Sequence, residues 1–444
     1  MAPWEAWAVA IEALSWMELR GLSERMALAT SARQLGVGDP ETLGMAHRMV
    51  CETTRKKNLI DRLVNKALHP SVITEFPLGV QAFLRLYTHE VKFAEVDRDD
   101  AVEIARVGRS ILGWRKLEPV EEALGRILGI TVGELLHGLS DEEKIALTTY
   151  HPTWFVRYCI RLLGRGEALK LLSANTKPPP VYVRLNTLKG SEEALVRRLE
   201  AEGVRLEEAG LEAVYRVSET RRPLVRTRAF RSGLFYIQDK ASCLAVLVAN
   251  PAPGDVVLDV CAAPGAKTTH MAQLMGNRGE IYSVDYSRRR MGVWLREVGR
   301  MGVQVAHPII ADACHLPLNV EADLVILDPP CTSTGAFARA PSAKWRLTRR
   351  SINGMAKLQW GMLNASARHV KPGGALVYTT CSITVEENEV LVERFLRLNP
   401  DFRLVDAEPR VGVPGLRGLW KCQRLYTHLH GCNGYFIARM VREA

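Results

Sequence analysis

The pattern of hydrophobic positions divides the chain into a helical first part and a mixed second part. Residues 1 to about 140 carry apolar side chains every three or four positions, as at Trp7, Ile11, Leu14 and Met17. This is the period of helices packed on one face. From about 234 onward, short β-favouring apolar runs alternate with helical patterns. This alternation predicts an α/β fold with a doubly wound parallel sheet.

The expected elements suggest three domains. Strands are predicted at 256–260, 281–284, 303–310, 324–327 and 375–380, with an antiparallel edge strand at 436–440. Helices are predicted near 267–275, 288–300, 353–369 and 385–398. A Pro-rich linker at 175–180 precedes a strand at 181–186, a helix at 191–202 and short β-like pieces up to Gly233. We therefore expect an all-helical domain at 1–140, a small α+β subdomain with the linker at 141–233, and an α/β domain at 234–444.

One predicted strand leads directly into an acid, two prolines and a thiol. Leu324 to Leu327 read as a buried strand, so Asp328 lies at its carboxyl end, where open α/β sheets bind ligands. Pro329 and Pro330 have no N–H group and a fixed φ, so the chain leaves the sheet as a stiff loop. The sequence thus predicts a rigid ledge that presents Asp328 and Cys331.

Two further strands end in similar chemistry. The strand at 375–380, after a turn signal at 371–374, runs into Cys381, so both cysteines reach the same edge if both strands lie in one sheet. The strand at 256–260 runs into a loop of small residues that allows close backbone approach to a ligand. This loop consists of Cys261, Ala262, Ala263, Pro264, Gly265, Ala266 and Lys267. The three strand ends are expected to converge on one pocket.

Three acids follow the first three predicted strands, namely Asp259, Asp285 and Asp312. Asp285 is placed to accept hydrogen bonds from ribose hydroxyls, and Asp312 lies one strand further, within reach of an adenine. The loop before Lys267 lacks the glycines of a phosphate-binding motif. A nucleoside without phosphates, S-adenosylmethionine, is therefore the predicted cofactor. The alternative for any one of these aspartates is a structural helix cap.

Charge and composition favour a polyanionic partner. The formal net charge is +10, which suits RNA, DNA or an acidic membrane face. Six arginines with interleaved aromatic residues suit phosphate contact and base stacking, although a solvated charged hairpin is the alternative. They are Arg216, Arg221, Arg222, Arg226, Arg228 and Arg231, with Tyr182, Tyr215, Phe230 and Phe235.

The cysteines and the apolar runs bear on the cellular compartment. Nine cysteines without regular spacing argue for a reducing cytosol. No run of 18 apolar residues and no signal peptide is found, so we expect a soluble cytoplasmic protein without a membrane partner. The spacing of Cys422, His428, His430 and Cys432 matches no usual zinc motif, so no metal site is predicted.

The combined motifs resemble the RsmB/NSUN family of RNA cytosine-5 methyltransferases. The resemblance rests on 261–270, Asp328-Pro329-Pro330-Cys331 and Thr379-Thr380-Cys381-Ser382, supported by 184–187, 238–242, 386–389 and 434–438. Two departures are Ala266, where a second glycine is usual, and Asn433, where Asp is usual. The resemblance implies a class I S-adenosylmethionine-dependent methyltransferase domain at 234–444. Residues 1–140 more weakly resemble a NusB-like RNA-binding domain.

The resemblance also implies roles for the two cysteines. A thiolate that adds to carbon 6 of cytosine makes carbon 5 nucleophilic, and the resemblance assigns this thiolate to Cys381. It implies that Cys331 assists release. Without the family, either cysteine is an acceptable nucleophile, and enzymes that methylate cytosine in DNA resemble the other choice.

Roles for the remaining site residues follow in the same way. Lys267 is expected to supply positive charge or to orient the base or cofactor. Asp328 is expected to bond the cytosine as a protonated acid whose pKa burial raises. The resemblance places 261–267 around the methionine part of the cofactor, Asp285 and Arg290 at the ribose, Asp312 at the adenine, and Asp328 beside both cofactor and base.

Ribosomal and transfer RNA remain open as substrates, and we expect a monomer. Two other functions compete. A methyltransferase acting on an exocyclic amine usually follows its prolines with an aromatic residue, and Cys331 stands there instead. A non-catalytic RNA-binding assembly factor has no need of Asp328, Cys331 and Cys381.

Overall fold

The computed structural model describes residues 2–94 and 96–444 and divides the chain into two compact units. The first unit comprises 1–177 together with the short segment 337–346, and the second comprises 178–336 and 347–444. The first unit continues past residue 140 through three more helices, so the expected boundary at 140 does not separate these two units. The division into three domains stays a prediction.

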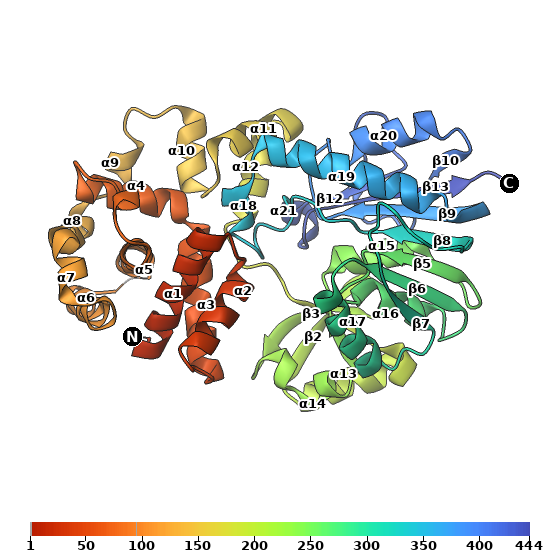
Figure 1. The fold of residues 1–444 in the computed structure, drawn as a ribbon, viewed down its shortest axis with the longest axis horizontal. Coiled ribbons are helices and arrows are strands. Elements are labelled where there is room, and N and C mark those ends of the chain that lie inside the picture. The colour runs from red at the N-terminus through yellow and green to blue at the C-terminus, as the bar shows by residue number, and fades with distance from the viewer. Residues whose placement is uncertain (1, 95) are drawn as a thin grey trace. The chain divides into compact units, whose positions relative to one another are not determined.

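The first unit is all-helical, as predicted for 1–140, and Figure 1 draws its helices from red to yellow. Several helices begin at side-chain caps: Asp97 accepts from the Asp100 N–H, and Ser140 and Glu143 cap each other's backbone N–H. The helices of residues 1–177 are α1 (Trp4–Arg20), α2 (Glu24–Gln34), α3 (Pro40–Arg55), α4 (Lys57–Leu68), α5 (Leu78–Phe93), α6 (Arg98–Leu112), α7 (Trp114–Leu117), α8 (Glu121–Gly129), α9 (Val132–Leu136), α10 (Asp141–Thr148), α11 (Thr153–Leu163) and α12 (Arg165–Ala174).

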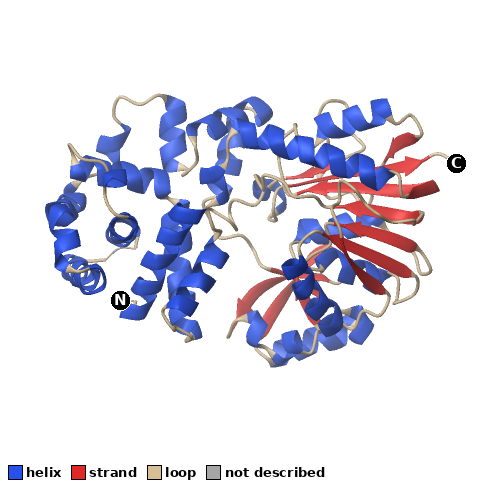
Figure 2. Ribbon diagram, in the orientation of Figure 1, coloured by secondary structure: helices blue, strands red, loops and turns tan. Residues whose placement is uncertain are grey.

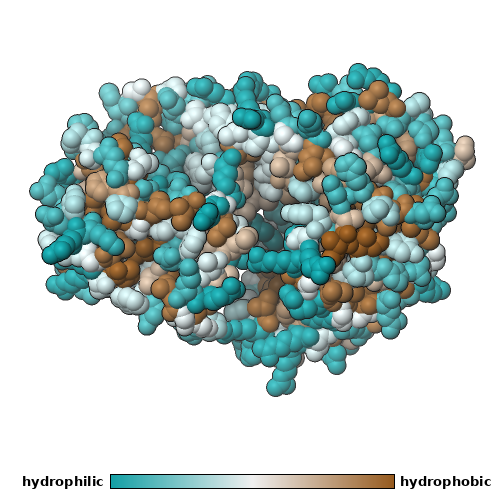
Figure 3. All heavy atoms as spheres, viewed as in Figure 1, coloured by the Kyte–Doolittle hydropathy of each residue, from teal (hydrophilic) through white to brown (hydrophobic). Residues whose placement is uncertain are grey.

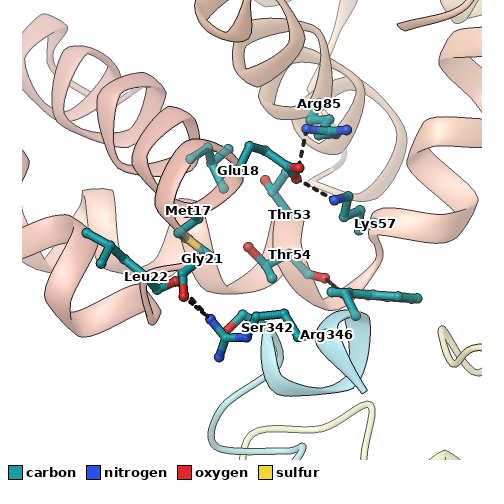
Figure 4. A pocket seen from close by; sticks show the side chains of 12 residues that line it. Met17, Glu18, Gly21, Leu22, Thr53, Thr54, Lys57, Arg85, Ser342 and Arg346 are labelled. Atoms are coloured by element: carbon teal, nitrogen blue, oxygen red, sulfur yellow. Dashed lines mark hydrogen bonds and ion pairs between the residues drawn. The ribbon is translucent and has the colours of Figure 1, made fainter. Parts of the chain in front are cut away.

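The segment 337–346 belongs to this helical unit although it lies between two elements of the other unit in sequence. Its short helix α18 (Ala343–Arg346) packs beside a cavity of about 200 Å³ (Figure 4). Trp345 Nε1 donates to the Thr54 carbonyl at 2.6 Å, and Ser342 N donates to Glu24 Oε1 at 2.6 Å. The chain that follows Cys331 is thereby fastened into the helical unit. The sequence pattern gave no sign of this.

The second unit begins with a small antiparallel sheet in the order β2-β3-β1-β4. Its strands are β1 (Tyr182–Leu185), β2 (Val204–Leu211), β3 (Val214–Thr220) and β4 (Phe235–Ile237), accompanied by α13 (Glu192–Ala201) and α14 (Arg228–Arg231). The strand at 181–186 and the helix at 191–202 are confirmed. All six arginines predicted to contact phosphate are exposed, whereas the aromatic Phe235 is fully buried and packs on Phe230. The expectation of base stacking is therefore wrong for Phe235, which lies in the core of the small sheet, whereas Phe230 is only partly buried against that core.

The larger sheet has the order β11-β12-β13-β9-β8-β5-β6-β7, with β10 paired to β13 (Figure 2). The five strands from β9 to β7 are parallel, which confirms the doubly wound α/β prediction. They are β5 (Val256–Val260), β6 (Glu280–Asp285), β7 (Ala306–Ile310), β8 (Ala322–Leu327) and β9 (Val370–Thr380). The remaining strands are β10 (Phe402–Val405), β11 (Val413–Pro414), β12 (Gln423–Leu425) and β13 (Tyr435–Arg442).

Two expectations about this sheet need correction. The strand predicted at 436–440 is antiparallel but is not an edge, because β13 pairs with β9 on one side and with β10 and β12 on the other. The turn signal at 371–374 lies inside β9, where the pairing with β8 jumps from Val370 to Ala375. These four residues form a bulge instead of a turn.

Helices cover both faces of the larger sheet (Figure 1). One face packs on α15 (Lys240–Ala249), α16 (Ala266–Leu274) and α17 (Arg288–Met301), and the other on α19 (Arg349–Ala367) and α20 (Glu389–Leu398). The four helices predicted from 267 onward are thus confirmed. A further short helix, α21 (Thr427–His430), follows β12.

On the face drawn in Figure 3, hydrophilic side chains alternate with smaller hydrophobic areas. Within the described residues, none of the helices combines the length and the apolar character that crossing a membrane requires.

Candidate active site

The two cysteines meet at the carboxyl end of the larger sheet. Strands β8 and β9 are parallel neighbours with Leu327 opposite Tyr378, so the loops that follow them leave the sheet at the same edge. Cys331 Sγ lies 3.1 Å from Cys381 Sγ. Ser333 Oγ is 3.6 Å from Cys381 Sγ. The expectation that both thiols reach one place is therefore confirmed.

The contact between the two sulfurs shifts the pKa values of the two thiols in opposite directions. The hydrogen bond from Cys331 lowers the pKa of the Cys381 thiol, with smaller contributions from Ser333 and the Lys267 ammonium. The same hydrogen bond, together with burial, raises the pKa of Cys331 well above its ordinary value. A thiolate is the reactive form of cysteine, so these shifts are in the direction expected if Cys381 is the nucleophile, which stays a prediction.

An ion pair lies beside the thiols. Lys267 Nζ, from the first turn of α16, is 2.5 Å from Asp328 Oδ2. Burial by itself lowers the pKa of Lys267, but the Asp328 carboxylate outweighs it and raises that pKa above its ordinary value. Thr379 Oγ1 and the Tyr435 hydroxyl each donate to Asp328 Oδ1 at 3.3 Å. Lys267 is therefore a fixed positive charge near Cys381.

The environment of Asp328 differs from the expected one. Its side chain is 31% exposed, and every hydrogen bond found to it is one that it accepts. An ionised carboxylate is acceptor-only, whereas a protonated acid donates. Asp328 is thus less buried than expected, because the stiff loop after β8 turns its side chain towards Lys267 and leaves 31% of it accessible, and the protonated form stays a prediction.

The loop of small residues makes a sharp turn between β5 and α16. Cys261 and Gly265 adopt left-handed backbone conformations, with φ of 68° and 107°. A side chain on Gly265 would bring its Cβ within 3.2 Å of the Trp294 ring, so glycine fits this position and larger residues do not. Ala266 is the first residue of α16, where it is compatible with helix formation. The departure from the family pattern at Ala266 thus leaves the turn intact.

The three strand-end acids occupy different environments. Asp285, at the end of β6, is buried and accepts from the Ala263 and Ser287 N–H groups, while Arg290 Nη1 lies 3.0 Å away. Asp312 follows β7 with a side chain that is 64% exposed. Asp259 is buried and accepts from Thr268 Oγ1 at 2.5 Å, and burial raises its pKa to about 7. Asp259 therefore ties β5 to α16.

Comparison with known proteins identifies the family. The model of the 16S rRNA methyltransferase RsmB/F family matches residues 246–441, and the model of the ferredoxin-like domain of RsmF/B-like methyltransferases matches 151–215. The ribosomal RNA small subunit methyltransferase B of Pasteurella multocida is 30% identical over 70% of this chain and 71% of its own length. The chain belongs to the RsmB/NSUN family of RNA cytosine-5 methyltransferases.

Two other comparisons extend over nearly the whole chain. A Bacillus subtilis protein named "Probable ribosomal RNA small subunit methyltransferase B" is 27% identical over 98% of each chain. The crystal structure of PH0851 superposes with a TM-score of 0.86, at 28% identity, over 100% of this chain and 99% of that one. The helical unit is therefore part of the shared architecture.

The structure brings together most of the residues predicted from the RsmB/NSUN motifs. Lys267, Asp328, Cys331 and Cys381 form one cluster, while Asp285 and Arg290 lie beside the loop at Ala263. Sequence reasoning missed contacts made by residues that it had quoted only as family patterns. Tyr435, which bonds Asp328, and Glu387, which bonds both cysteine loops, are the clearest cases. Antiparallel pairing and loop closure create these contacts, and neither leaves a spacing signal.

Proposed function

We propose that this chain transfers a methyl group from S-adenosylmethionine to carbon 5 of a cytosine in RNA through a covalent bond from Cys381 to carbon 6. The observation that carries the proposal is the 3.1 Å contact between Cys331 and Cys381, beside the Lys267–Asp328 pair. Small-subunit ribosomal RNA is the proposed substrate, since the relative that matches along its full length carries that name.

The residues around the small-residue loop fit the cofactor. Asp285 offers a carboxylate at the end of β6, and Arg290, which pairs with it and donates to the Ala263 carbonyl, has a side chain that is 43% exposed beside the place proposed for the ribose. The exposed carboxylate of Asp312 suits an adenine amine. The loop backbone from Cys261 to Ala266 borders the methionine part. When bound, S-adenosylmethionine supplies an electrophilic methyl group.

Catalysis begins at Cys381. Its lowered pKa increases the thiolate fraction available to attack carbon 6. The attack moves negative charge towards N3 and O2 of the ring, and the Lys267 ammonium stabilises it. The Asp328 side chain is placed to hydrogen-bond the exocyclic amine and so orients the cytosine. Carbon 5 becomes nucleophilic and takes the methyl group.

Release reverses the covalent bond. Once a water molecule takes the carbon 5 proton, the electrons of that C–H bond form the C5–C6 double bond and the C6–S bond breaks, which expels Cys381 as a thiolate. Cys331 holds its proton within 3.1 Å of the departing sulfur and is placed to share that proton with it. Both thiols must stay reduced, so we propose a reducing cytoplasmic location.

The RNA is recognised outside this cluster. The exposed arginines of the small sheet suit phosphate contacts, and the target cytosine must be unstacked to reach Cys381. The helical unit, for which a NusB-like role in RNA binding is proposed, extends the contact area. We propose that the protein acts as a monomer with S-adenosylmethionine and RNA as its only ligands.

The test is a covalent-adduct assay on a denaturing gel. Wild type, Cys331→Ala, Cys381→Ala and the control Cys314→Ala are incubated with S-adenosylmethionine and either ribosomal or transfer RNA. We expect Cys331→Ala alone to accumulate an adduct, with ribosomal RNA. An adduct that needs Cys331 and survives loss of Cys381 would reverse the roles. Cofactor binding without methylation of any RNA would favour the assembly-factor alternative.

A further inference from the structure

A buried carboxylate that has no part in the mechanism above connects the two cysteine loops. Glu387 precedes α20 and is 0% exposed. On the Cys331 side, its oxygens accept from the Thr332 N–H at 2.9 Å and from Thr332 Oγ1 at 2.5 Å. On the Cys381 side, they accept from Ser382 Oγ at 2.6 Å and Thr384 Oγ1 at 2.7 Å. Each loop is therefore fastened to Glu387 one to three residues from its cysteine.

The carboxylate is satisfied without a counter-ion. A fifth donor, Gln359 Nε2, reaches Glu387 Oε1 at 2.9 Å, and the same amide also donates to the Pro330 carbonyl at 2.9 Å. Among the described residues no lysine, arginine or histidine nitrogen lies within 4 Å of Glu387. A buried charge held only by hydrogen bonds acts strongly on its neighbours, because few mobile charges screen it.

The two loops also bond each other directly. Thr334 Oγ1 is 2.9 Å from Ser382 Oγ and accepts from the Ile383 N–H at 2.9 Å. The Gly335 N–H donates to the Cys381 carbonyl at 3.0 Å. Every one of these bonds lies on the side of the loops that faces Glu387 or the adjoining backbone. Together they fix the distance between the two sulfurs.

We propose that Glu387 is a positioning residue that locks the two cysteine loops in register and holds the proton on Cys331. The negative charge of Glu387 disfavours a thiolate at Cys331, and it adds to the effect of the Cys381 hydrogen bond and of burial on the pKa of Cys331. Cys331 consequently remains the donor and Cys381 the acceptor. The assignment of roles to two otherwise similar cysteines thus depends on a residue that touches neither substrate nor cofactor. The catalytic part of this inference rests on the proposed function.

Glu387→Gln separates charge from shape. The carbonyl oxygen of a glutamine accepts from the Thr332 and Gln359 N–H groups, and its two N–H donors serve two of the three hydroxyls of Thr332, Ser382 and Thr384, so all but one bond of the network is retained. Glu393→Gln is the matched control, because Glu393 lies in α20 and pairs only with the exposed Arg417. Thr384→Val removes two side-chain bonds on the Cys381 side, to Glu387 and to Ser382 Oγ, and leaves the charge in place.

The experiment measures iodoacetamide labelling of Cys331 and Cys381 against pH by mass spectrometry on the full-length protein. In Glu387→Gln we expect the Cys331 midpoint to move down and the Cys381 midpoint to move up, each by about one pH unit, a tenfold change in thiolate fraction. We expect kcat for RNA to fall at least about tenfold with the KM for S-adenosylmethionine unchanged. Thr384→Val should move the Cys381 midpoint alone.

Two results would overturn the inference. One is labelling midpoints in Glu387→Gln that match those of Glu393→Gln. The other is a loss of kcat in Glu387→Gln with both midpoints unmoved, which would make Glu387 a merely structural residue. If Glu387→Gln fails to fold, an unmoved Cys381 midpoint in Thr384→Val counts against the inference. Labelling requires no RNA. The labelling midpoints therefore test the role of Glu387 even if the protein proves not to methylate RNA.

Discussion

Cys331 Sγ lies 3.1 Å from Cys381 Sγ, and this contact makes the two cysteines unequal. The two strands that carry them are parallel neighbours, so the fold alone presents the thiols as near equivalents. Their acidities diverge because one sulfur donates a hydrogen bond and the other accepts it. We therefore expect the hydrogen-bond network, and not the fold, to decide which cysteine is the nucleophile.

This inequality is measurable without substrate. At pH 7.5 we expect iodoacetamide to label Cys381 at least about tenfold faster than Cys331, since the pKa of Cys381 is lowered and that of Cys331 is raised. Cys331→Ala removes the donor and should move the Cys381 labelling midpoint to higher pH, while Cys314→Ala leaves it in place. Faster labelling of Cys331 in the wild type would refute the assignment of the nucleophile.

The Lys267–Asp328 pair should matter more for kcat than for cofactor binding. Asp328→Asn keeps the shape but removes the charge that raises the pKa of Lys267. We expect kcat to fall by about 10²-fold, as when a positioned charge at a reacting group is lost, with S-adenosylmethionine affinity changed less than about threefold. Single-turnover methylation and calorimetric titration test this. A variant that loses affinity and keeps kcat would place Asp328 at the cofactor only.

Much of the α/β unit was predictable because its signals are local. Apolar runs such as Leu324 to Leu327 and the prolines after Asp328 act within a few residues, and parallel pairing then carries the cysteines to one edge. The interior position of β13 was not predictable, because it depends on β10 and β12, which are short and carry no alternating pattern.

Contacts between segments that are distant in sequence explain the remaining features that the sequence did not predict. The protonated Asp328 was expected from burial, but the carboxylate meets Lys267 from another loop and stays partly exposed. Trp345 packs on the helical unit although its neighbours in sequence belong to the sheet unit. Glu387 stands in a motif that was recognised as a family pattern, yet only the folded chain shows that it bonds both cysteine loops.

The two candidate cofactor acids should contribute unequally. Asp285 is buried and fixed by the Ala263 and Ser287 N–H groups, whereas Asp312 is largely exposed to water. A hydrogen bond to a buried charged group contributes more to affinity than one to a solvated group. We expect Asp285→Asn to weaken S-adenosylmethionine binding at least about tenfold and Asp312→Asn about threefold or less, measured by calorimetric titration. The reverse order would show that Asp312 is the principal nucleoside contact.

The raised pKa of Asp259 predicts that the stability of the fold depends on pH, independently of catalysis. Burial raises its pKa to about 7 in the folded state, while an unfolded chain returns it to its ordinary value near 3.8. The folded protein therefore binds the proton more tightly. The stability that the raised pKa of Asp259 contributes is fully present below about pH 4 and is lost as the pH rises to about 7.

Asp259→Asn removes this ionisation and retains an oxygen that accepts from Thr268. We expect the free energy of unfolding of the variant minus that of wild type to be larger, so that the variant is relatively more stable, at pH 8 than at pH 5 by an amount on the order of a few kcal/mol. Urea denaturation at the two pH values measures the difference. A variant whose stability differs from wild type by the same amount at both pH values would mean that Asp259 is already ionised in the folded protein at pH 5.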